Sequence, residues 1–412
     1  MFRAPNAVSE NSLQGRNMEP EQTPIPPGQH REPSARVTNT AAQSNESSAN
    51  ALLAVFKLIA VLYLFFLAIT LMGGTFKLFG GGFAKTLIET TANPIVGLFI
   101  GILATSIIQS SSTTTSIVVT LVASGTLTID NAIPIVMGAN VGTSVTNTLV
   151  SMAHITRREE FRRAVAGATV HDFFNLMAVA VLLPVELLTG YLSKFALWFE
   201  GMFESVGGLK LVSPLKVITK PVVKFLEHLV LDTFGLPQTI GGIILLVGAL
   251  ALLFFSLKQF VNIMRKIVVG RVERVIHDVL FESPLRSFGL GLVLTSIVQS
   301  SSITTSLIVP MIGAGILTVE QFYPFTLGAN IGTTVTSMMA ALATGSAQGV
   351  TIAFVHLLFN ISGCAIFYPL RALPIRASHL LGKIAAENRY IVIVYILVTF
   401  FLLPLLLIFL TR

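Results

Sequence analysis

The chain has little charge and almost no cysteine. Only 11% of its 412 residues are Asp, Glu, Lys or Arg, whereas a soluble globular domain carries roughly a quarter. Hydrophobic residues make up 53%, and several apolar runs approach the ~20 residues that cross a bilayer as a helix. The single cysteine, Cys364, excludes a framework of intrachain disulfides. These shortages predict an all-α polytopic membrane protein in a lipid bilayer.

The few charges are unevenly placed. Lys and Arg gather in short segments such as 157–163, which has four arginines, and 258–286, and such segments stay on the cytoplasmic side of a membrane. Residues 1–50 are polar, contain no apolar stretch typical of a cleaved signal peptide, and are expected to form a disordered cytoplasmic tail. No basic face is evident, so a nucleic-acid partner is not expected.

The rest of the chain divides into two halves. We expect transmembrane repeats over 51–199 and 239–389, an extracytoplasmic connector over 200–238, and a C-terminal transmembrane helix over 390–412. The arginine-rich loop 157–163 has an uncharged counterpart at 344–349. The halves are therefore predicted to have opposite topology. Inverted repeats place substrate and coupling ions near the bilayer midplane, at the repeat interface.

A four-residue motif, Gln-Ser-Ser-Ser, occurs once in each half. It stands at 109–112 and at 299–302, and the offset of 190 residues holds through a second motif, Gly-Ala-Asn-Val/Ile-Gly-Thr. Between 105–150 and 295–340, 22 of 46 positions are identical. Lipid cannot satisfy polar groups inside an apolar span. Each Gln-Ser-Ser-Ser motif is therefore predicted to break its helix and form a discontinuous or re-entrant segment facing a protein-lined cavity.

Such a break favours the binding of ions. It exposes backbone N–H groups at the start of a half-helix, and serine hydroxyls and the glutamine amide add donors and acceptors. No Lys or Arg occurs between Lys85 and Arg157, or between Arg286 and Arg371. An anion bound here would be neutralised by helix dipoles, hydroxyls and co-bound cations, which favours coupled transport. The simpler alternative is that small polar residues only allow close helix packing.

Further polar residues lie deep inside the predicted spans. Asn140 and Asn330 stand in the Gly-Ala-Asn motifs, whose glycines predict close helix approach or local unwinding. Asp172 is the one acidic residue deep in a span and has no acidic counterpart in the second half; an intramembrane carboxylate is a candidate functional group. The repeat partners His171 and His356 are interpreted mainly as hydrogen bonders between helices.

These motifs, together with the stretch 162–175, resemble the type II sodium–phosphate cotransporters, including the animal IIa and IIb transporters. The resemblance covers about 50–405. It implies sodium-driven symport of inorganic phosphate, with the divalent form preferred, and neither a catalytic residue nor a cofactor apart from the transported sodium. The connector lacks the large cysteine-containing loop of the animal members, which suggests a bacterial inner-membrane protein with a cytoplasmic N-terminus.

The resemblance also implies, by position, which residues hold each ion. With the neighbouring motif residues included, the phosphate-binding set is Gln109, Ser110, Ser111, Ser112, Asn140, Thr143, Ser300, Ser302 and Asn330. The sodium-binding set is Gln299, Ser300, Ser301, Thr333, Thr336 and Asp172. Within it, Asp172 matches the aspartate that supports an additional sodium ion in electrogenic members.

Three alternatives stay open. Another tetrahedral oxyanion could be the cargo, and an ion channel would use similar hydroxyls and carbonyls. An intramembrane hydrolase would combine a motif serine with His171 and Asp172. However, no Gly-x-Ser-x-Gly elbow surrounds these serines, and a nucleophile needs no second copy. The sequence does not fix the oligomeric state, so a homodimer remains open.

Overall fold

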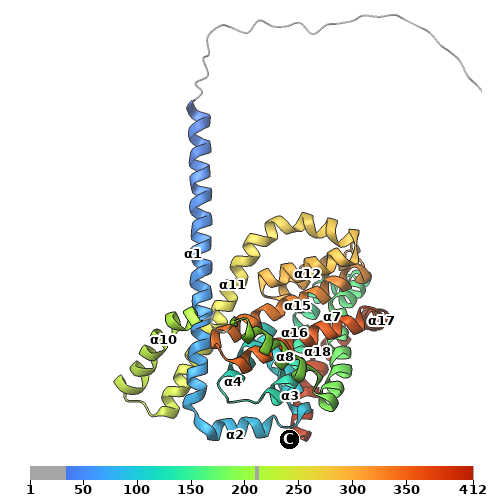
Figure 1. The fold of residues 1–412 in the computed structure, drawn as a ribbon. Coiled ribbons are helices and arrows are strands. Elements are labelled where there is room, and N and C mark those ends of the chain that lie inside the picture. Colours follow the sequence, from blue (N-terminus) through green and yellow to red (C-terminus); the bar gives the residue numbers. More distant parts are fainter. Residues whose placement is uncertain (1–33, 209–212, 412) are drawn as a thin grey trace, which may run out of the picture. The chain divides into compact units, whose positions relative to one another are not determined.

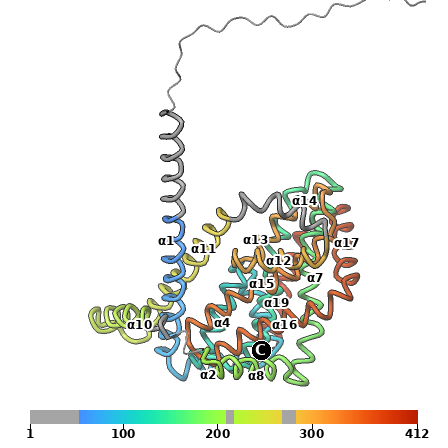
Figure 2. The backbone as a smooth tube through the Cα atoms, turned by 45° about the horizontal axis from the view of Figure 1, so that its top comes forward, coloured from blue at the N-terminus to red at the C-terminus, as the bar shows by residue number. Residues whose placement is uncertain are grey.

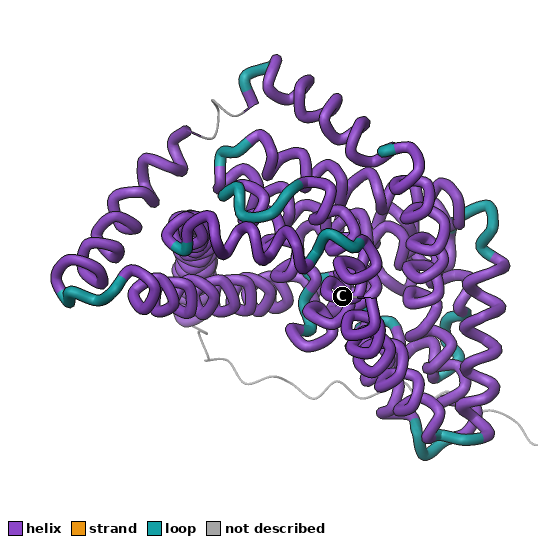
Figure 3. The backbone as a smooth tube through the Cα atoms, turned by 90° about the horizontal axis from the view of Figure 1, so that it is seen from below, coloured by secondary structure: helices purple, strands orange, loops and turns teal. Residues whose placement is uncertain are grey.

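In the computed structural model, the backbone is described for residues 34–208 and 213–411, and side chains for 52–208, 217–267 and 283–411. All regular elements in these ranges are helices, as the sequence predicts (Figures 1 and 3). Five described helices are long and apolar enough to cross a membrane. A sixth span results if the pair α2 and α3, bent by 101°, crosses as one unit. The chain is an all-α polytopic membrane protein.

The two halves contain equivalent helical segments in the same order, although the later helix breaks fall at different positions. The first half has α3 (Pro94–Ile108), α4 (Ser111–Ala123), α5 (Ile129–Gly142), α6 (Val145–Ser151) and α7 (Arg158–Thr189). The second has α12 (Pro284–Val298), α13 (Ser301–Ser306), α14 (Val309–Gly313), α15 (Val319–Thr344) and α16 (Ala347–Phe367). In both, a Gln-Ser-Ser-Ser motif separates the first two helices. The predicted helix breaks are therefore present at both motifs.

Helices outside this repeated set surround it in sequence. They are α1 (Ser34–Leu78), α2 (Gly80–Thr90), α8 (Tyr191–Ser205), α10 (Ser213–His228), α11 (Gln238–Glu282), α17 (Ala372–Glu387), α18 (Tyr390–Leu397) and α19 (Leu403–Thr411). The backbone of α1 is helical from Ser34, which corrects the expectation of disorder for the later part of 1–50; residues 1–33 lie outside the described residues. Residues Met1–Leu53 form a separate unit, and all features below lie in the compact unit Ala54–Arg412.

Glycines bring equivalent helices of each repeat into close contact. Helix α3 packs extensively against α5, and α12 against α15. A Cβ atom at Gly138 would collide with the Leu98 carbonyl oxygen, and one at Gly328 with the Phe288 carbonyl oxygen. The glycines of the Gly-Ala-Asn motifs therefore serve close backbone approach, one of the two readings that the sequence allows. Membrane helices associate through such small residues because lipid gives no hydrophobic driving force between them.

We expect Gly328→Ala to destabilise the fold by about 1–3 kcal/mol, because the new methyl group meets rigid backbone of α12. The matched control is Gly289→Ala on α12, where a Cβ atom meets nothing within 4 Å. That control should leave stability unchanged or raise it, since alanine is the better helix former. Thermal unfolding of the detergent-solubilised protein measures both. Equal shifts in the two variants would contradict the proposed close packing.

The two repeats also pack against one another. Helix α4 of the first repeat contacts α15 and α16 of the second (Figure 2). Helices α13 and α14 of the second repeat contact α6 of the first. This interleaving places both motif breaks among buried residues. The serines and threonines that follow each break are almost entirely buried, from Ser111 to Ser116 in the first half and from Ser301 to Thr305 in the second.

Candidate functional site

Each Gln-Ser-Ser-Ser motif begins with a strained glutamine. Gln109 and Gln299 have φ values of 59° and 62°, and they are the two non-glycine residues with positive φ in the described part of the chain. A long side chain in this left-handed region is uncommon and is held there by its surroundings. Both glutamines end the preceding helix, and the chain then turns into α4 or α13.

The first serine of each motif caps the next helix. The Thr113 N–H donates to Ser110 Oγ at 3.2 Å, and the Ile303 N–H donates to Ser300 Oγ at 3.4 Å. A side-chain oxygen at this position satisfies one of the N–H groups that a helix start leaves without a partner. Ser110 and Ser300 therefore fix the break itself.

The third serine of each motif links the two repeats. Ser112 Oγ donates to the Gln299 carbonyl oxygen at 3.1 Å, and Ser302 Oγ donates to the Thr143 carbonyl oxygen at 3.2 Å. Each bond runs from one repeat to the other. The two motifs thus lie together at the repeat interface, where the sequence predicts a shared site.

The hydroxyl of the second serine of each motif has no partner among the described residues. Ser111 and Ser301 are 4% and 2% exposed, and neither hydroxyl forms a hydrogen bond with another described group. Both hydroxyl oxygens keep a small accessible area. A nearly buried hydroxyl without a partner is costly unless a ligand or water satisfies it. Ser111 and Ser301 are therefore the motif groups most available to an ion.

The glutamine side chains are anchored by equivalent threonines. Thr146 Oγ1 donates to Gln109 Oε1 at 2.7 Å, and Thr336 Oγ1 donates to Gln299 Oε1 at 2.5 Å. Each glutamine Nε2 donates to a carbonyl of its own preceding helix turn. Thr336 Oγ1 also contacts Ser112 Oγ at 3.3 Å, so Gln299 and its threonine lie beside the first motif.

Further bonds between the repeats come in reciprocal pairs. Asn147 and Thr305 exchange hydrogen bonds of 2.8 and 3.0 Å, and the equivalent Ser337 donates to Thr115 Oγ1 at 2.9 Å. Ser337 is the repeat equivalent of Asn147, and Thr115 is the equivalent of Thr305, so the same pair of positions is in contact twice across the interface. This reciprocity is the pattern of an approximate twofold relation between the halves.

Asn140 and Asn330 join a polar network among helices. Asn330 Oδ1 lies 2.5 Å from His171 Nε2, and Asn140 Oδ1 lies 3.3 Å from His356 Nε2. Asn175 Nδ2 also donates to the Asn140 carbonyl oxygen at 3.0 Å. The two histidines thus act as hydrogen bonders between helices. Direct phosphate binding by Asn140 and Asn330 stays a prediction, and their contacts suit positioning of the motif helices.

Asp172 is completely buried in α7. Its Oδ2 accepts hydrogen bonds from Thr148 Oγ1 at 3.3 Å and from the Tyr395 hydroxyl at 3.1 Å. Its Oδ1 has no hydrogen bond of normal geometry, although the Ser144 hydroxyl lies close enough to interact with the carboxylate, and no described Lys, Arg or His forms an ion pair with it. A buried carboxylate with an open oxygen has a strong requirement for a proton or a cation.

The family model described as Na+/Pi-cotransporter matches residues 64–203 and 252–373 of this chain. The chain belongs to the Na+/Pi-cotransporter family. Sodium-dependent phosphate transport protein 2A of Ovis aries is 38% identical over 428 residues, which cover 86% of this chain and 67% of that protein. The 2B protein of Homo sapiens is 36% identical over 439 residues, which cover 84% of this chain and 64% of that protein. No solved structure matches the chain.

Membership of the Na+/Pi-cotransporter family confirms the resemblance that the motifs predict, and it disfavours the hydrolase alternative. The structure does not assemble a catalytic triad in the described residues, because the His171 ring is hydrogen-bonded to Asn330 and Asp172 to Thr148 and Tyr395. The relatives are named as transporters. The remaining residues of the predicted sets, Thr143 and Thr333, donate to carbonyls one helical turn earlier.

Two contacts of this Na+/Pi-cotransporter site escaped the sequence analysis. Thr148 lies after the break between α5 and α6, and Tyr395 lies in α18, outside the repeated set. Tyr395 does carry a weak signal, because a phenol inside an apolar span needs a hydrogen-bond partner. Its partner could not be named from spacing, since Tyr395 and Asp172 are 223 residues apart in the chain.

Proposed function

We propose that this protein is a secondary active symporter that couples the inward sodium gradient to uptake of inorganic phosphate. The observation that supports this most directly is the pair of nearly buried, unpartnered hydroxyls of Ser111 and Ser301, one in each motif. The named activity of its relatives, sodium-dependent phosphate transport, agrees with that site.

The first motif suits an oxyanion. Helix α4 begins at Ser111, and the N–H groups of its first turn have no intrahelical acceptor apart from the cap. These donors, the Ser111 hydroxyl and the positive end of the α4 dipole can surround phosphate oxygens. The charge of phosphate would then be balanced by co-bound sodium, which explains how an anion binds without a nearby arginine.

The second motif suits sodium. Gln299 Oε1, the Ser301 hydroxyl and the hydroxyls of Thr333 and Thr336 are uncharged oxygens of the kind a hard cation prefers. Thr336 already contacts both Gln299 and Ser112. A sodium ion here would lie beside the first motif, so binding of cation and anion would favour one another. This coupling is the basis of symport in the proposal.

Asp172 is proposed to bind an additional sodium ion. Transport of divalent phosphate with two sodium ions is electrically neutral, and a third sodium makes the cycle electrogenic. The open Oδ1 of Asp172 and the neighbouring oxygens of Thr148 and Tyr395 form an oxygen-lined site without a protein cation. A bacterial inner membrane with the N-terminus in the cytoplasm remains the proposed location.

The decisive test is uptake of radiolabelled phosphate into proteoliposomes. We expect uptake with an inward sodium gradient and loss of most uptake when choline replaces sodium. Unlabelled arsenate and sulfate serve as competitors, and stronger competition by either than by phosphate would change the proposed cargo. Sodium-independent phosphate flux, or discrete single-channel currents, would favour the channel alternative instead.

A further inference from the structure

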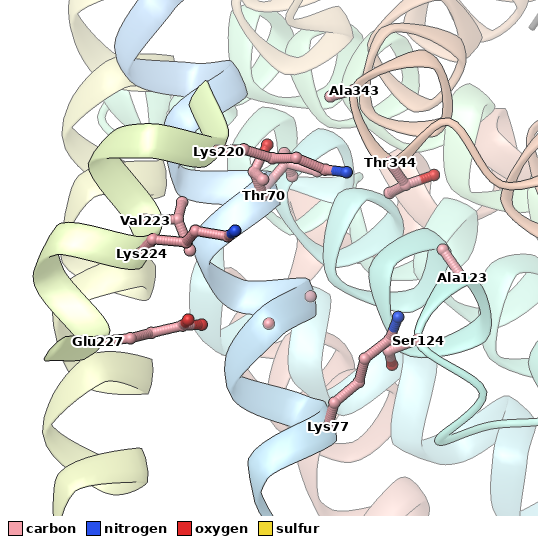
Figure 4. Close-up of a pocket in the computed structure, with 13 residues that line it drawn as sticks. Thr70, Lys77, Ala123, Ser124, Lys220, Val223, Lys224, Glu227, Ala343 and Thr344 are labelled. Atoms are coloured by element: carbon pink, nitrogen blue, oxygen red, sulfur yellow. The ribbon is translucent and has the colours of Figure 1, made fainter. Parts of the chain in front are cut away.

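A polar cavity lies at the end of α4 opposite the motif break. It has a volume of about 370 Å³ and lies between α1, α10 and the C-terminal ends of α4 and α15 (Figure 4). Its charged lining residues are Lys77, Lys220, Lys224 and Glu227. We call this cavity the lysine pocket. It is distinct from the Gln-Ser-Ser-Ser site, because none of the motif residues lines it.

The lysine pocket has an excess of positive charge. Figure 4 shows Lys220 and Lys224 extending from α10 in the same direction, with Lys77 reaching towards Ser124 from α1. None of the three lysines has an ion-pair partner within 4.0 Å among the described residues. The single acidic lining residue, Glu227, places its carboxylate against Gly74 and attracts Lys224 without forming an ion pair, so it offsets only part of the charge of the three lysines.

Helix dipoles account for only part of this arrangement. Lys77 stands in the last turn of α1, where a cation is normally favourable. Lys220 and Lys224 lie in the interior of α10, one turn apart, where two like charges repel. An anion between these lysines would remove that repulsion. The hydroxyls of Ser124 and Thr344 line the same cavity, but they donate to the Leu121 and Ala341 carbonyl oxygens, so the lysines are the donors for such a ligand.

The equivalent position in the second repeat is covered. Arg163 Nε donates to the Gly313 carbonyl oxygen at 3.0 Å, and the His154 ring packs against Gly313 at the end of α14. By the 190-residue offset, Gly313 corresponds to Ala123, which lines the lysine pocket. The same place in the fold is therefore filled in one repeat and hollow in the other.

The lysine pocket adjoins the helices that lead to the motif site. Helix α4 runs from Ser111 to the pocket over 13 residues, or about 18 Å at 1.5 Å per residue. Helix α15 carries Thr336 and reaches the pocket at Thr344. Between the two ends, the bond from Ser337 to Thr115 bridges α15 and α4. The pocket and the motif site are thus neighbours that remain separated in this structure.

The distribution of Lys and Arg predicts on which side the pocket lies. The connector 200–238, which contains α10, and the uncharged loop 344–349 are both predicted to be extracytoplasmic. The lysine pocket therefore faces the side from which an imported anion arrives. A cavity lined by an excess of one sign of charge raises the local concentration of the opposite ion and its association rate.

We propose that the lysine pocket is an extracytoplasmic binding site for a phosphate oxyanion, which collects the anion before it reaches the motif serines. The collecting role rests on the proposed function. The same chemistry fits two sources, free inorganic phosphate and the phosphate of an anionic lipid headgroup. The two sources differ in what controls binding, because one depends on phosphate concentration and the other on lipid composition.

The test compares Lys220→Gln/Lys224→Gln with a control of equal charge change, Lys85→Gln/Lys194→Gln. Neither control lysine lines the pocket. Lys85 pairs with Glu89 at 3.8 Å, and Lys194 donates to the Thr189 carbonyl oxygen. In phosphatidylcholine vesicles, the pocket variant should raise the KM for phosphate roughly 3- to 10-fold with maximal rate retained. Added choline chloride should shrink this difference, because salt screens the lysines. The control should match wild type.

Each outcome decides the proposal. A raised KM in phosphatidylcholine alone identifies free phosphate as the ligand. An unchanged KM there, with loss in the pocket variant of a response to added phosphatidylglycerol, identifies the lipid headgroup as the ligand and overturns the collecting role. Absence of both effects, in variants that melt like wild type, overturns the proposal. Lys220→Arg/Lys224→Arg should restore the wild-type KM, since it retains both charges.

A second measurement separates this proposal from the proposed function. Inorganic phosphate in sodium-free buffer should slow acetylation of Lys220 and Lys224 in the wild-type protein, while Lys85 reacts at an unchanged rate. Mass spectrometry of the modified lysines reports this without any transport. Protection in a protein that shows no sodium-dependent uptake would support the pocket and reject the symport proposal. No protection, combined with unchanged KM and unchanged lipid response, would reject the pocket alone.

Discussion

Replacing Ser111 and Ser301 together by alanine should abolish sodium-dependent phosphate uptake while leaving the protein folded. These two hydroxyls are nearly buried and make no hydrogen bond within the described protein, so their loss costs the fold little. A hydrogen bond to a charged ligand contributes about 1.5–3 kcal/mol, or roughly 10- to 150-fold in affinity for each serine. The single variants should therefore raise the KM for phosphate or sodium, and the double variant should lose uptake almost entirely.

The matched control removes hydroxyls from the same helices, one buried at Ser116 and one partly buried at Ser306. Ser116 and Ser306 are repeat partners whose hydroxyls donate only to carbonyls of α4 and α13 in the described structure. Ser116→Ala and Ser306→Ala should transport nearly as wild type. Gln109→Ala and Gln299→Ala should each lose most uptake, because both amides belong to the site. Near-normal uptake in the alanine variants of Gln109, Gln299, Ser111 and Ser301 would reject the assignment of the site.

The helix breaks could be predicted from the sequence because their cause is local. Gln-Ser-Ser-Ser cannot face lipid, and its duplication at a constant offset indicates one site built from both halves. What could not be predicted is how three identical serines divide their contacts. That division depends on the left-handed backbone at Gln109 and Gln299, which turns the first serine into a cap and the third towards the other repeat.

The repeats also differ in the continuity of the helix that follows the motif, and the sequence contains the cause of this difference. The continuous helix α4 corresponds to two helices, α13 and α14, in the second half. Pro310 stands where the first half has Thr120, and proline removes a backbone N–H and clashes with the preceding turn. The chain accordingly leaves the α-helix at Leu307 and Ile308.

The surroundings of Asp172 show where sequence reasoning reaches its limit. Its depth in an apolar span singles it out, since an unpaired intramembrane carboxylate is costly. Its partners come from α6 and α18, and no periodicity connects α18 with the repeats. Long-range contacts of this kind follow from tertiary packing, so Tyr395 became a candidate only with the structure.

Removal of the Asp172 carboxylate should abolish the voltage dependence of phosphate uptake. The buried carboxylate of Asp172 has no cationic partner among the described residues, so a bound sodium ion is the proposed counter-charge. Three sodium ions with one divalent phosphate carry one net positive charge inward. That charge contributes about 2.3 kcal/mol per 100 mV, or roughly a 50-fold gain in phosphate accumulation. Asp172→Asn and Asp172→Gly should lose this gain, retain sodium-dependent uptake and bind one fewer sodium ion.

Initial uptake measured against a potassium–valinomycin potential gives the answer directly. Wild-type uptake should accelerate when the vesicle interior is negative, and the Asp172 variants should respond little. Tyr395→Phe is the informative control, because it removes a hydroxyl that donates to Asp172 while leaving the carboxylate in place. It should keep the voltage response and weaken sodium binding. A variant of Asp172 with full voltage dependence and unchanged sodium stoichiometry would place the extra cation elsewhere. If uptake by the wild-type protein does not depend on voltage, transport is electroneutral. The buried carboxylate of Asp172 would then be protonated rather than bound to sodium.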